Sequence, residues 1–538
     1  MASQAEYDVA VIGGGHNGLA TAGYLSRAGI KTVVLERRGI VGGAAVTEEF
    51  HPGFRNSVCS YVVGLLHPKV IKDLQLNEYG LDIIERTGTT FLPLPAGDSM
   101  FISPKIEDTE REIRRFSAQD AERYRAFHEE LQSAADVIRD TLLETPPNLA
   151  GGFGDLLSVI KMGNRFRKLD RTKQRSFIDL MTMSIGDYLD EWFEGDPLKG
   201  HLSWDSIVGN MVSPYHPGSA YVLIHHVIGE THGKKGVWGH ARGGMGAITQ
   251  AMARSAEATG AEIRVNSPVR EVIVEKGIAR GVVLSDGSIV RAKAVAANVG
   301  PKLLYLKLID RSALDSDFLR QMEGWRCRSG TFRMNVALSE LPRFHGLDRI
   351  SHVAQPLNGG IHICPSLDYL ERAYDDAKRG AWSKDPLVSM IIPSLCDDSL
   401  APEGRHVASL FCQHFNPQLA DGQTWDDVRE IVADHIIATV NRYAPNFTSS
   451  ILGRQVLSPL DLEREFGLVG GDIFHGALQL DQLWALRPAA GYAQYRGPLR
   501  NLYMCGSGSH PGGGVTGVPG HNAAREIIKD FRKRKLAA

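Results

Sequence analysis

Glycine-rich segments near the two ends of the 538-residue chain have the residue types and spacing that bind nucleotide phosphates. The first, Gly13-Gly14-Gly15-His16-Asn17-Gly18, satisfies the pattern G-x-G-x-x-G. Gly13 permits a tight turn, Gly15 lets the backbone approach a pyrophosphate, and Gly18 lets a following helix pack closely on a sheet. The free N–H groups and dipole at the helix start would hold the phosphate charges. The segment therefore predicts a dinucleotide site.

The elements around this motif must be in the right order for it to work. Residues 7–12 are a short β-branched run that predicts a buried strand, residues 19–28 predict a helix, and residues 31–35 predict a second strand ending in Glu36. An acidic residue at this distance can accept hydrogen bonds from both hydroxyls of an adenosine ribose. The expected ligand-binding residues here are Gly13, Gly14, Gly15, Asn17, Gly18, Glu36 and Arg37. Arg37 beside Glu36 leaves NAD open as an alternative to FAD.

A second glycine pair, Gly42-Gly43, begins six residues after Glu36 and is followed by Ala44. In flavoproteins of the glutathione-reductase type, a glycine pair at this position lines the pyrophosphate and the flavin end of FAD. The pair therefore favours FAD, and Gly42, Gly43 and Ala44 join the predicted site.

The C-terminal segment repeats the strand, glycine loop and helix arrangement. A predicted strand at 501–505 enters residues 506–520, of which seven are glycine, and a predicted helix follows at 521–531. Only 21 residues follow Gly517, so a second complete dinucleotide domain is excluded. The loop is expected to contact the same cofactor through Gly506, Ser507, Val515, Thr516 and Val518.

Taken together, these motifs resemble those of the phytoene desaturase-like flavoproteins, the carotenoid desaturase and isomerase group of the amine-oxidase-like FAD superfamily. The resemblance covers essentially the whole chain, including the closing segment from Leu502 to Val518. It implies an FAD cofactor and a backbone contact from Val269 to the adenine. Ala44 departs from the amine-oxidase branch, which usually has arginine there. Ser507 also departs from that branch, which usually has an acidic residue.

The same resemblance predicts an α/β fold with a Rossmann-type FAD-binding domain and a discontinuous substrate domain. The FAD domain is expected to combine residues 1–80, 235–310 and 490–538. The substrate or cap domain is expected to combine residues 81–234 and 311–489. Three consecutive domains are the alternative, but that arrangement would leave the two glycine loops unrelated. Residues 106–145 have apolar side chains at helical spacing and predict an amphipathic helix over the substrate domain.

The expected activity is FAD-dependent oxidation of an apolar or amphipathic small molecule by desaturation, oxidation or isomerisation. Hydride would pass to flavin N5, and oxygen, a quinone or another acceptor would reoxidise the flavin. If the reaction needs a base, His475 and His510 are the candidates, because both lie in glycine-rich, motif-like segments. Two alternatives stay open: an FAD-bearing scaffold or regulatory protein with little turnover, and a flavin amine oxidase.

The net charge, the cysteines and one basic segment indicate which partners and which location to expect. The net charge of −2 gives no basic excess for nucleic acid, and no histidine and carboxylate spacing suggests a metal site. The six cysteines are widely separated, which excludes a CxxC motif and favours a cytoplasmic protein. Residues 161–175 carry seven basic residues and one acid, so they form either a solvated basic face or a peripheral contact with anionic lipid.

Overall fold

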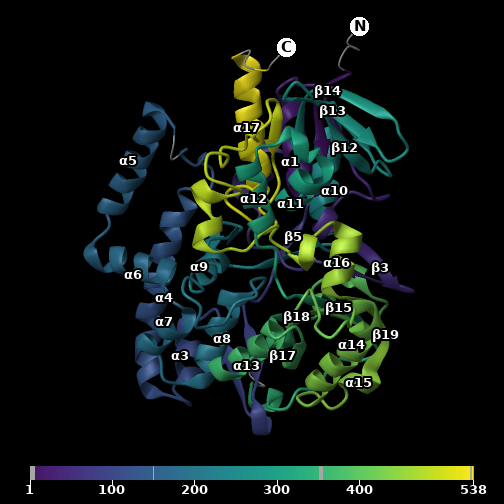
Figure 1. Cartoon of the computed structure of the whole chain (residues 1–538). Helices are drawn as coiled ribbons and strands as arrows, with labels where there is room; N and C mark the ends of the chain where they lie inside the picture. The colour runs from purple at the N-terminus through teal and green to yellow at the C-terminus, as the bar shows by residue number, and fades with distance from the viewer. Residues whose placement is uncertain (1–5, 149–150, 351–355, 534–535, 537–538) are drawn as a thin grey trace.

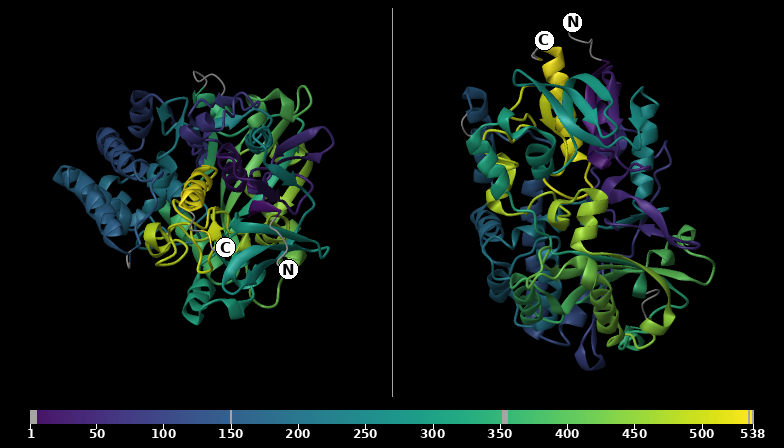
Figure 2. Two further views of the ribbon diagram at one scale, coloured as in Figure 1. Left: turned by 90° about the horizontal axis from the view of Figure 1, so that it is seen from above. Right: turned by 45° about the vertical axis from the view of Figure 1, so that its right-hand side comes forward.

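Two sheet-containing domains lie one above the other, with a group of helices beside the lower one (Figure 1). The computed structural model describes residues 6–148, 151–350, 356–533 and 536. Both ends of the described chain lie at the top of the upper domain, and Figure 2 shows the same stacking from two further directions.

The upper domain is built on a seven-stranded sheet. Its strand order is β11-β2-β1-β14-β13-β12, and β20 also pairs with β14. Pairing is parallel among β11, β2, β1, β14 and β20, and antiparallel in the β12–β13–β14 meander. The strands are β1 (Tyr7–Ile12), β2 (Thr32–Leu35), β11 (Glu262–Arg264), β12 (Val269–Glu275), β13 (Ile278–Leu284), β14 (Ile289–Ala297) and β20 (Leu502–Met504).

Helices cover one face of the parallel strands, and side chains of the β12–β13–β14 meander pack on their other face. The helices are α1 (His16–Arg27), α10 (Gly246–Glu257) and α17 (Val518–Arg532). Val9 and Val11 of β1 belong to the apolar layer on the helix side, whereas Ala10 and Ile12 belong to the layer on the meander side. This alternation follows from the two-residue period of a strand, and burial on both faces explains why β1 is apolar from Val9 to Ile12. The α/β class with a Rossmann-type FAD-binding domain is confirmed.

The lower domain contains a second seven-stranded sheet, in the order β19-β15-β18-β17-β16-β6-β7. One face of this sheet packs against α14 (Trp425–Asn441) through a large apolar cluster, and the other faces α8 (Asp196–Ile207) and α13 (Leu367–Lys378). The strands are β6 (Thr90–Pro93), β7 (Ser99–Ile102), β15 (Phe332–Leu338), β16 (Gly360–Ile363), β17 (Trp382–Ile391), β18 (His406–Phe415) and β19 (Ile451–Leu457).

Shorter elements connect the domains. Three two-stranded sheets pair β5 with β10, β3 with β4, and β8 with β9. Their bounds are β3 (Thr47–His51), β4 (Phe54–Ser57), β5 (Ile83–Glu85), β8 (Glu230–Thr231), β9 (Lys234–Lys235) and β10 (Gly239–Ala241). The remaining short helices are α2 (Pro68–Asp73), α11 (Pro301–Leu303), α12 (Ser316–Gly324), α15 (Phe447–Ser450) and α16 (Pro459–Phe466).

A helical lobe packs beside the lower domain, and residues 106–145 begin it. The sequence predicts one amphipathic helix there, but the structure has two, α3 (Ile106–Ile113) and α4 (Ala118–Arg139). The break arises because the Ser117 hydroxyl accepts a hydrogen bond from the Asp120 N–H at 3.1 Å and caps a new helix. The lobe continues with α5 (Phe153–Arg167), α6 (Arg171–Thr182), α7 (Ile185–Trp192) and α9 (Tyr221–Val227).

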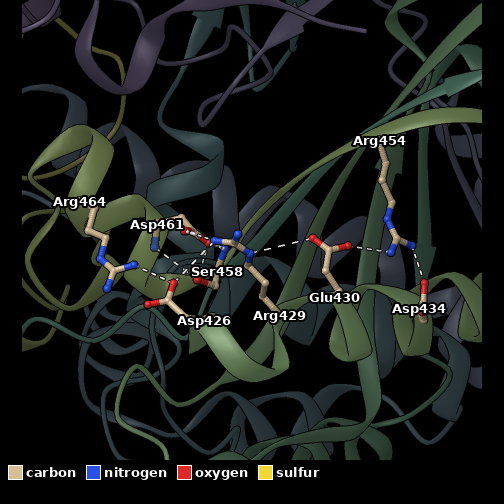
Figure 3. A network of polar contacts seen from close by, with 8 residues as sticks. All are labelled: Asp426, Arg429, Glu430, Asp434, Arg454, Ser458, Asp461 and Arg464. Atoms are coloured by element: carbon tan, nitrogen blue, oxygen red, sulfur yellow. Dashed lines mark hydrogen bonds and ion pairs between the residues drawn. The ribbon is translucent and has the colours of Figure 1, made fainter. Parts of the chain in front are cut away.

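A network of ion pairs ties α16 to α14 and β19 on the surface of the lower domain (Figure 3). Arg464 pairs with Asp426 at 2.7 Å, and Arg429 pairs with Asp461 at 2.9 Å. The N-terminus of α16 is a capping box, in which Ser458 and Asp461 each satisfy the other's backbone N–H. The network therefore fixes both the position and the start of α16.

Replacing Ser458 with alanine is expected to lower the free energy of unfolding by about 1 kcal/mol, because the N–H of Asp461 loses its acceptor. Urea unfolding followed by circular dichroism measures the change. The exposed Ser449→Ala is the matched control and should change stability by less than about 0.5 kcal/mol. Equal effects of the two substitutions would show that the capping box contributes no stability.

Candidate functional site

The first glycine motif forms the turn between β1 and α1 and touches the end of β2. Gly14 donates its N–H to Glu36 Oε2 at 2.8 Å, and Arg38 donates its N–H to Glu36 Oε1 at 2.9 Å. Glu36 is 5% exposed. A carboxylate has about four lone-pair sites, so two remain for the hydroxyls of a ribose. Glu36 is therefore held in place by the turn and can still accept from a nucleotide.

The second glycine pair lies directly on this turn. Gly42 donates its N–H to the carbonyl oxygen of Gly14 at 2.9 Å, and Gly15 and Gly42 form a parallel bridge. A Cβ at residue 43 would lie 3.3 Å from the Cα of Gly15. Gly42 and Gly43 both have positive φ, at 135° and 53°. Only glycine fits here without strain, so the pair and the first turn form one continuous backbone cradle.

The N-terminal and C-terminal motifs meet in this cradle. Asn17 donates from Nδ2 to Ser507 Oγ at 3.2 Å, and His16 Nε2 lies 3.2 Å from the carbonyl oxygen of Gly514. A Cβ at residue 520 would lie only 2.2 Å from the carbonyl oxygen of Asn17, so α1 and α17 are in backbone contact. The two loops, almost 500 residues apart, therefore build a single site.

Asn298, at the end of β14, is a member of the site that the sequence analysis missed. Its Nδ2 donates to the carbonyl oxygen of Gly13 at 3.2 Å, and its side chain is the nearest neighbour that a Cβ at Gly15 or Gly506 would meet. The available signal was that a polar residue ends an alanine and valine strand of a parallel sheet. Ligands bind at that edge of such sheets.

The donor set of the cradle fits a flavin dinucleotide. The first N–H groups of α1 have no intrahelical acceptor. Asn17 is 1% exposed, and its Oδ1 has no hydrogen-bond partner among the described residues. Backbone donors at a helix start, a buried acidic side chain and an unsatisfied amide oxygen match the pyrophosphate and ribose of FAD.

Of the remaining predicted cofactor residues, two lie near the cradle and one has its side chain directed away from it. Val269 starts β12, two residues after Ser267, whose N–H donates to the carbonyl oxygen of Glu36 at 2.7 Å. Ala44 accepts from the Ser60 N–H at 2.9 Å, which fixes the segment after the glycine pair. Arg37 is not brought to the cradle, since its guanidinium donates to the carbonyl oxygen of Arg464 on α16 at 3.0 Å.

A cavity of about 250 Å³ opens between the C-terminal loop and the helical lobe. Thr516 and Val518 line it, and the neighbouring Val515 packs in the cluster under α2. The Thr516 hydroxyl also accepts from the Val518 N–H at 3.1 Å and so starts α17. Most of the lining is apolar and includes Leu65, Leu66, Leu142, Tyr221, Ile228 and Pro511, and Arg139 and Glu230 are its charged members.

His225 of α9 lines this cavity and is buried. Its Nε2 has no hydrogen-bond partner among the described residues, and a Cβ at Gly514 would lie 3.6 Å from it. Burial, together with smaller effects of the nearby His226 and Arg487, lowers the pKa of His225 to about 3. The side chain is therefore neutral at pH 7 and is a weak base.

The two histidines predicted to handle protons differ in position. His475 contacts Gly300, and His16 is close enough to lower the pKa of His475. These two neighbours place His475 beside the cradle. His510 instead points to the helical lobe, where its Nε2 lies 3.2 Å from the carbonyl oxygen of Thr141. Burial lowers the pKa of each to about 4. A base of that pKa is weak at neutral pH, so a proton-accepting role for either residue stays a prediction.

A buried pair, His240 and Asp397, joins β10 to the lower domain. His240 Nε2 lies 3.0 Å from Asp397 Oδ2, and the side chains are 2% and 0% exposed. Burial alone would raise the pKa of Asp397. Hydrogen bonds from His240, Ser399 and the Gly243 N–H outweigh that effect and hold the pKa well below its usual range. The carboxylate therefore stabilises the folded protein at neutral pH.

Asp397→Asn is expected to cost about 2 kcal/mol of unfolding free energy at pH 7, because a charged acceptor is lost. A lowered folded-state pKa contributes stability above the unfolded value of about 3.9, and that contribution is lost as the pH falls toward the folded value. Urea unfolding at pH 7 and near pH 3 should therefore show that the difference in unfolding free energy between the parent protein and the variant is smaller in acid. The neighbouring Asp398 has a side chain that is 96% exposed, and Asp398→Asn is the control. It should unfold with the same free energy as the parent protein at either pH.

The described residues contain no group of three or more histidine, cysteine or acidic side chains that could hold a metal ion. All six cysteines are free thiols. No helix among the described residues has the length and apolar character required to cross a bilayer. The arrangement is that of a flavoprotein with a nucleotide-binding sheet domain above a second, sheet-based domain.

Comparison with known proteins agrees with this class. Residues 18–329 match the model of the flavin containing amine oxidoreductase family. The chain is 40% identical to pyridine nucleotide-disulfide oxidoreductase domain-containing protein 2 of Rattus norvegicus, over 98% of this chain and 94% of the relative. It is 26% identical to the lycopene-forming phytoene desaturase of Pantoea ananas, over 95% and 96% of the two chains. The solved structure of putrescine oxidase bound to putrescine has the same fold, with a TM-score of 0.59 at 17% identity and coverage of 98% and 99%.

The chain belongs to the flavin containing amine oxidoreductase family. The predicted resemblance to phytoene desaturase-like flavoproteins is confirmed, and so is the FAD cofactor. The protein is an FAD-dependent oxidoreductase that acts on small molecules.

Proposed function

We propose that the protein oxidises an apolar or amphipathic small molecule by removing hydride from a C–H bond. Bound FAD would supply the two-electron chemistry, and oxygen, a quinone or another acceptor would take up the electrons. The chain supplies binding, orientation and exclusion of water. The observation that carries the proposal is the largely apolar cavity beside the C-terminal glycine loop, whose buried histidine is a weak base.

The chemistry of this lining suits a C–H substrate better than a charged one. An apolar wall removes water from around the substrate and positions it by shape, and oxidation at an unactivated carbon needs few titrating groups. A relative named phytoene desaturase supports the same substrate class. Amine oxidation is the alternative that the family name suggests, but Ala44 and Ser507 differ from the usual residues of that branch.

Anaerobic titration of the purified holoprotein tests the proposal. Isoprenoids, acyl compounds and amines are added in turn, and the loss of the visible flavin absorption band is recorded. Reduction by an isoprenoid or acyl compound, with reoxidation on admitting an acceptor, is the expected result. Reduction by amines alone would replace the proposal with amine oxidation. If no compound reduces flavin that dithionite reduces, the protein is a flavin-bearing scaffold.

We also propose that α5 rests on an anionic lipid surface, which would make the protein peripheral to a membrane. This helix stands away from the body at the left of Figure 1. Its polar side faces the protein, where Arg165 pairs with Glu144 at 2.7 Å and Asp155 accepts from Gln494 at 2.7 Å. Apolar side chains on the other side are 49% to 55% exposed, namely Leu156, Leu157 and Ile160.

An exposed apolar face beside a basic segment is the pattern of an interfacial helix. The basic residues of 161–175 supply the attraction to lipid headgroups, and salt should weaken it. Free thiols are typical of a reducing compartment, so the proposed location is the cytoplasmic side of that membrane.

Co-sedimentation with phosphatidylcholine vesicles, with and without phosphatidylserine, tests the lipid contact. Binding should require phosphatidylserine and fall with added salt. The double variant Leu157→Glu, Ile160→Glu should lose it. The control Ile431→Glu, Leu452→Glu places the same charges on exposed apolar residues of α14 and β19 and should still bind. Binding that survives in the α5 variant would refute the assignment.

A further inference from the structure

Arg333 carries a buried positive charge that the chain does not neutralise. It lies on β15 and is 1% exposed. Its Nη1 donates to the carbonyl oxygen of Leu410 at 2.6 Å and its Nη2 donates to Ser409 Oγ at 2.8 Å, whereas Nε has no partner among the described residues. The guanidinium carbon stacks over the ring of Tyr61 at 4.6 Å. Every one of these neighbours is uncharged.

No carboxylate among the described residues pairs with Arg333, and the residues outside that description include no aspartate or glutamate. A desolvated charge without a counter-ion is costly, and folded proteins normally pair it. Arg487, which is equally buried, shows the contrast. Its guanidinium donates to several backbone carbonyls and has the carboxylate of Asp472 nearby. The partners of Arg487 explain its burial by a structural role, whereas the neighbours of Arg333 do not balance its charge.

Arg333 faces the part of the chain that follows the second glycine pair. Asn335, two residues along β15 and therefore on the same face, donates to the carbonyl oxygen of Ser57 at 3.1 Å. Ser60 donates its N–H to Ala44, directly after Gly42 and Gly43. The Tyr61 ring, next in sequence, is half-buried against the guanidinium. The arginine therefore lies under the segment that leads away from the cofactor cradle.

A second arginine adds to the positive charge around Tyr61. Arg86 donates to the backbone carbonyls of Asn358 and Gly359 and lies within electrostatic range of the Tyr61 hydroxyl. The carboxylate of Asp205 acts electrostatically on Tyr61 as well, whereas the groups that act on Arg333 are the uncharged Tyr61, Cys59 and Cys412. Two arginines and one carboxylate therefore surround Tyr61, and the carboxylate does not neutralise Arg333.

We propose that Arg333, with Tyr61 and Arg86, holds the carboxylate head of an amphipathic acid whose apolar part is the group oxidised. This inference rests on the proposed function and narrows its substrate class. A guanidinium forms short, charge-assisted hydrogen bonds to a carboxylate, and the unpartnered Nε–H of Arg333 is available for one. The aromatic faces of Tyr61 and Phe411 around the guanidinium complete an amphipathic wall.

Calorimetric titration of the holoprotein with three probes tests the inference: decanoate, decanol and benzoate, each below its aggregation concentration. Decanoate should bind at least about tenfold more tightly than decanol, the expected effect of one charge-assisted hydrogen bond in a dry site. Arg333→Met should abolish that preference and leave decanol binding unchanged, and Arg333→Lys should retain part of it. The exposed Arg343→Met is the control and should behave as the parent protein.

The possible results distinguish failure of this inference from failure of the proposed function. Equal affinity for decanoate and decanol in the parent protein, or a preference that survives in Arg333→Met, overturns the carboxylate site while an apolar site stands. If benzoate binds in a way that depends on Arg333 and decanol does not bind, the carboxylate site is supported. The apolar site is then refuted. If none of the probes binds, both fail. Because methionine removes an unpaired buried charge, the variant should melt no lower than the parent, which distinguishes a ligand site from a structural role.

Discussion

The Gly18→Ala protein is expected to be purified with little bound flavin. An added Cβ at this position would lie 2.2 Å from the carbonyl oxygen of Gly13 and 2.9 Å from the Asn298 side chain. Both neighbours are fixed by the sheet, so the turn itself must shift away from α1. Overpacking of this kind costs about 1–3 kcal/mol. Since each 1.4 kcal/mol is about tenfold in affinity, FAD should bind about ten to a hundred times more weakly.

The ratio of flavin to protein absorbance measures the loss, and titration of the apoprotein with FAD gives the affinity. Gly163→Ala is the matched control, because a Cβ there meets nothing within 4 Å. Alanine in the interior of α5 should be neutral or slightly stabilising. Full flavin occupancy in Gly18→Ala, with both proteins equally stable, would mean that the close approach of α1 to the turn is not needed for binding.

Much of the cofactor site could be predicted from the sequence because its determinants are local. The strand, Gly13–Gly18, the helix and Glu36 occupy one continuous stretch, and each position has a steric or hydrogen-bonding reason to be what it is. The C-terminal loop is recognisable for the same reason. The contact between the loops was an inference from shared chemistry, and the hydrogen bond from Asn17 to Ser507 now supplies it.

Residues whose roles depend on distant partners escaped the sequence analysis. Asn298 looks like an ordinary strand end until Gly13 and Gly506 are placed against it. Arg333 lies in an apolar strand and shows its unusual charge only when its neighbours on β18 are known. The lower sheet pairs β6 with β16, about 270 residues later, and no local pattern encodes such a pairing.

The side chain of Arg37 takes a direction that the local pattern did not indicate. It follows Glu36 directly, and its nearness in sequence placed it in the predicted cofactor site. Side chains of successive residues at a strand end point to opposite sides. Arg37 accordingly faces α16 while Glu36 faces the turn.

Arg487→Met is expected to be the most destabilising single substitution considered, at about 3–5 kcal/mol, and to weaken flavin retention as well. The Arg487 side chain is 0% exposed and donates to the carbonyl oxygen of Ser507 from both Nε and Nη2, at 3.0 and 2.8 Å. It also donates to the carbonyl oxygens of Phe474, Gly476, Ala477 and Gln482. Removing it leaves these buried acceptors, and Asp472, without their cation.

The coupling to flavin distinguishes Arg487 from a residue that only fills the core. Because Ser507 receives a hydrogen bond from Asn17, a loosened Ser507 loop should loosen the cradle before the sheet unfolds. Thermal melting followed by flavin fluorescence should then show release of FAD at a lower temperature than the loss of helical circular dichroism. Arg487→Lys should behave almost as badly, since one ammonium cannot reach acceptors on both sides. The control Arg372→Met removes only an exposed pair with Asp368 and should leave both transitions in place. Simultaneous flavin release and unfolding in Arg487→Met would show instead that the arginine supports the whole fold and gives the loop no separate stability.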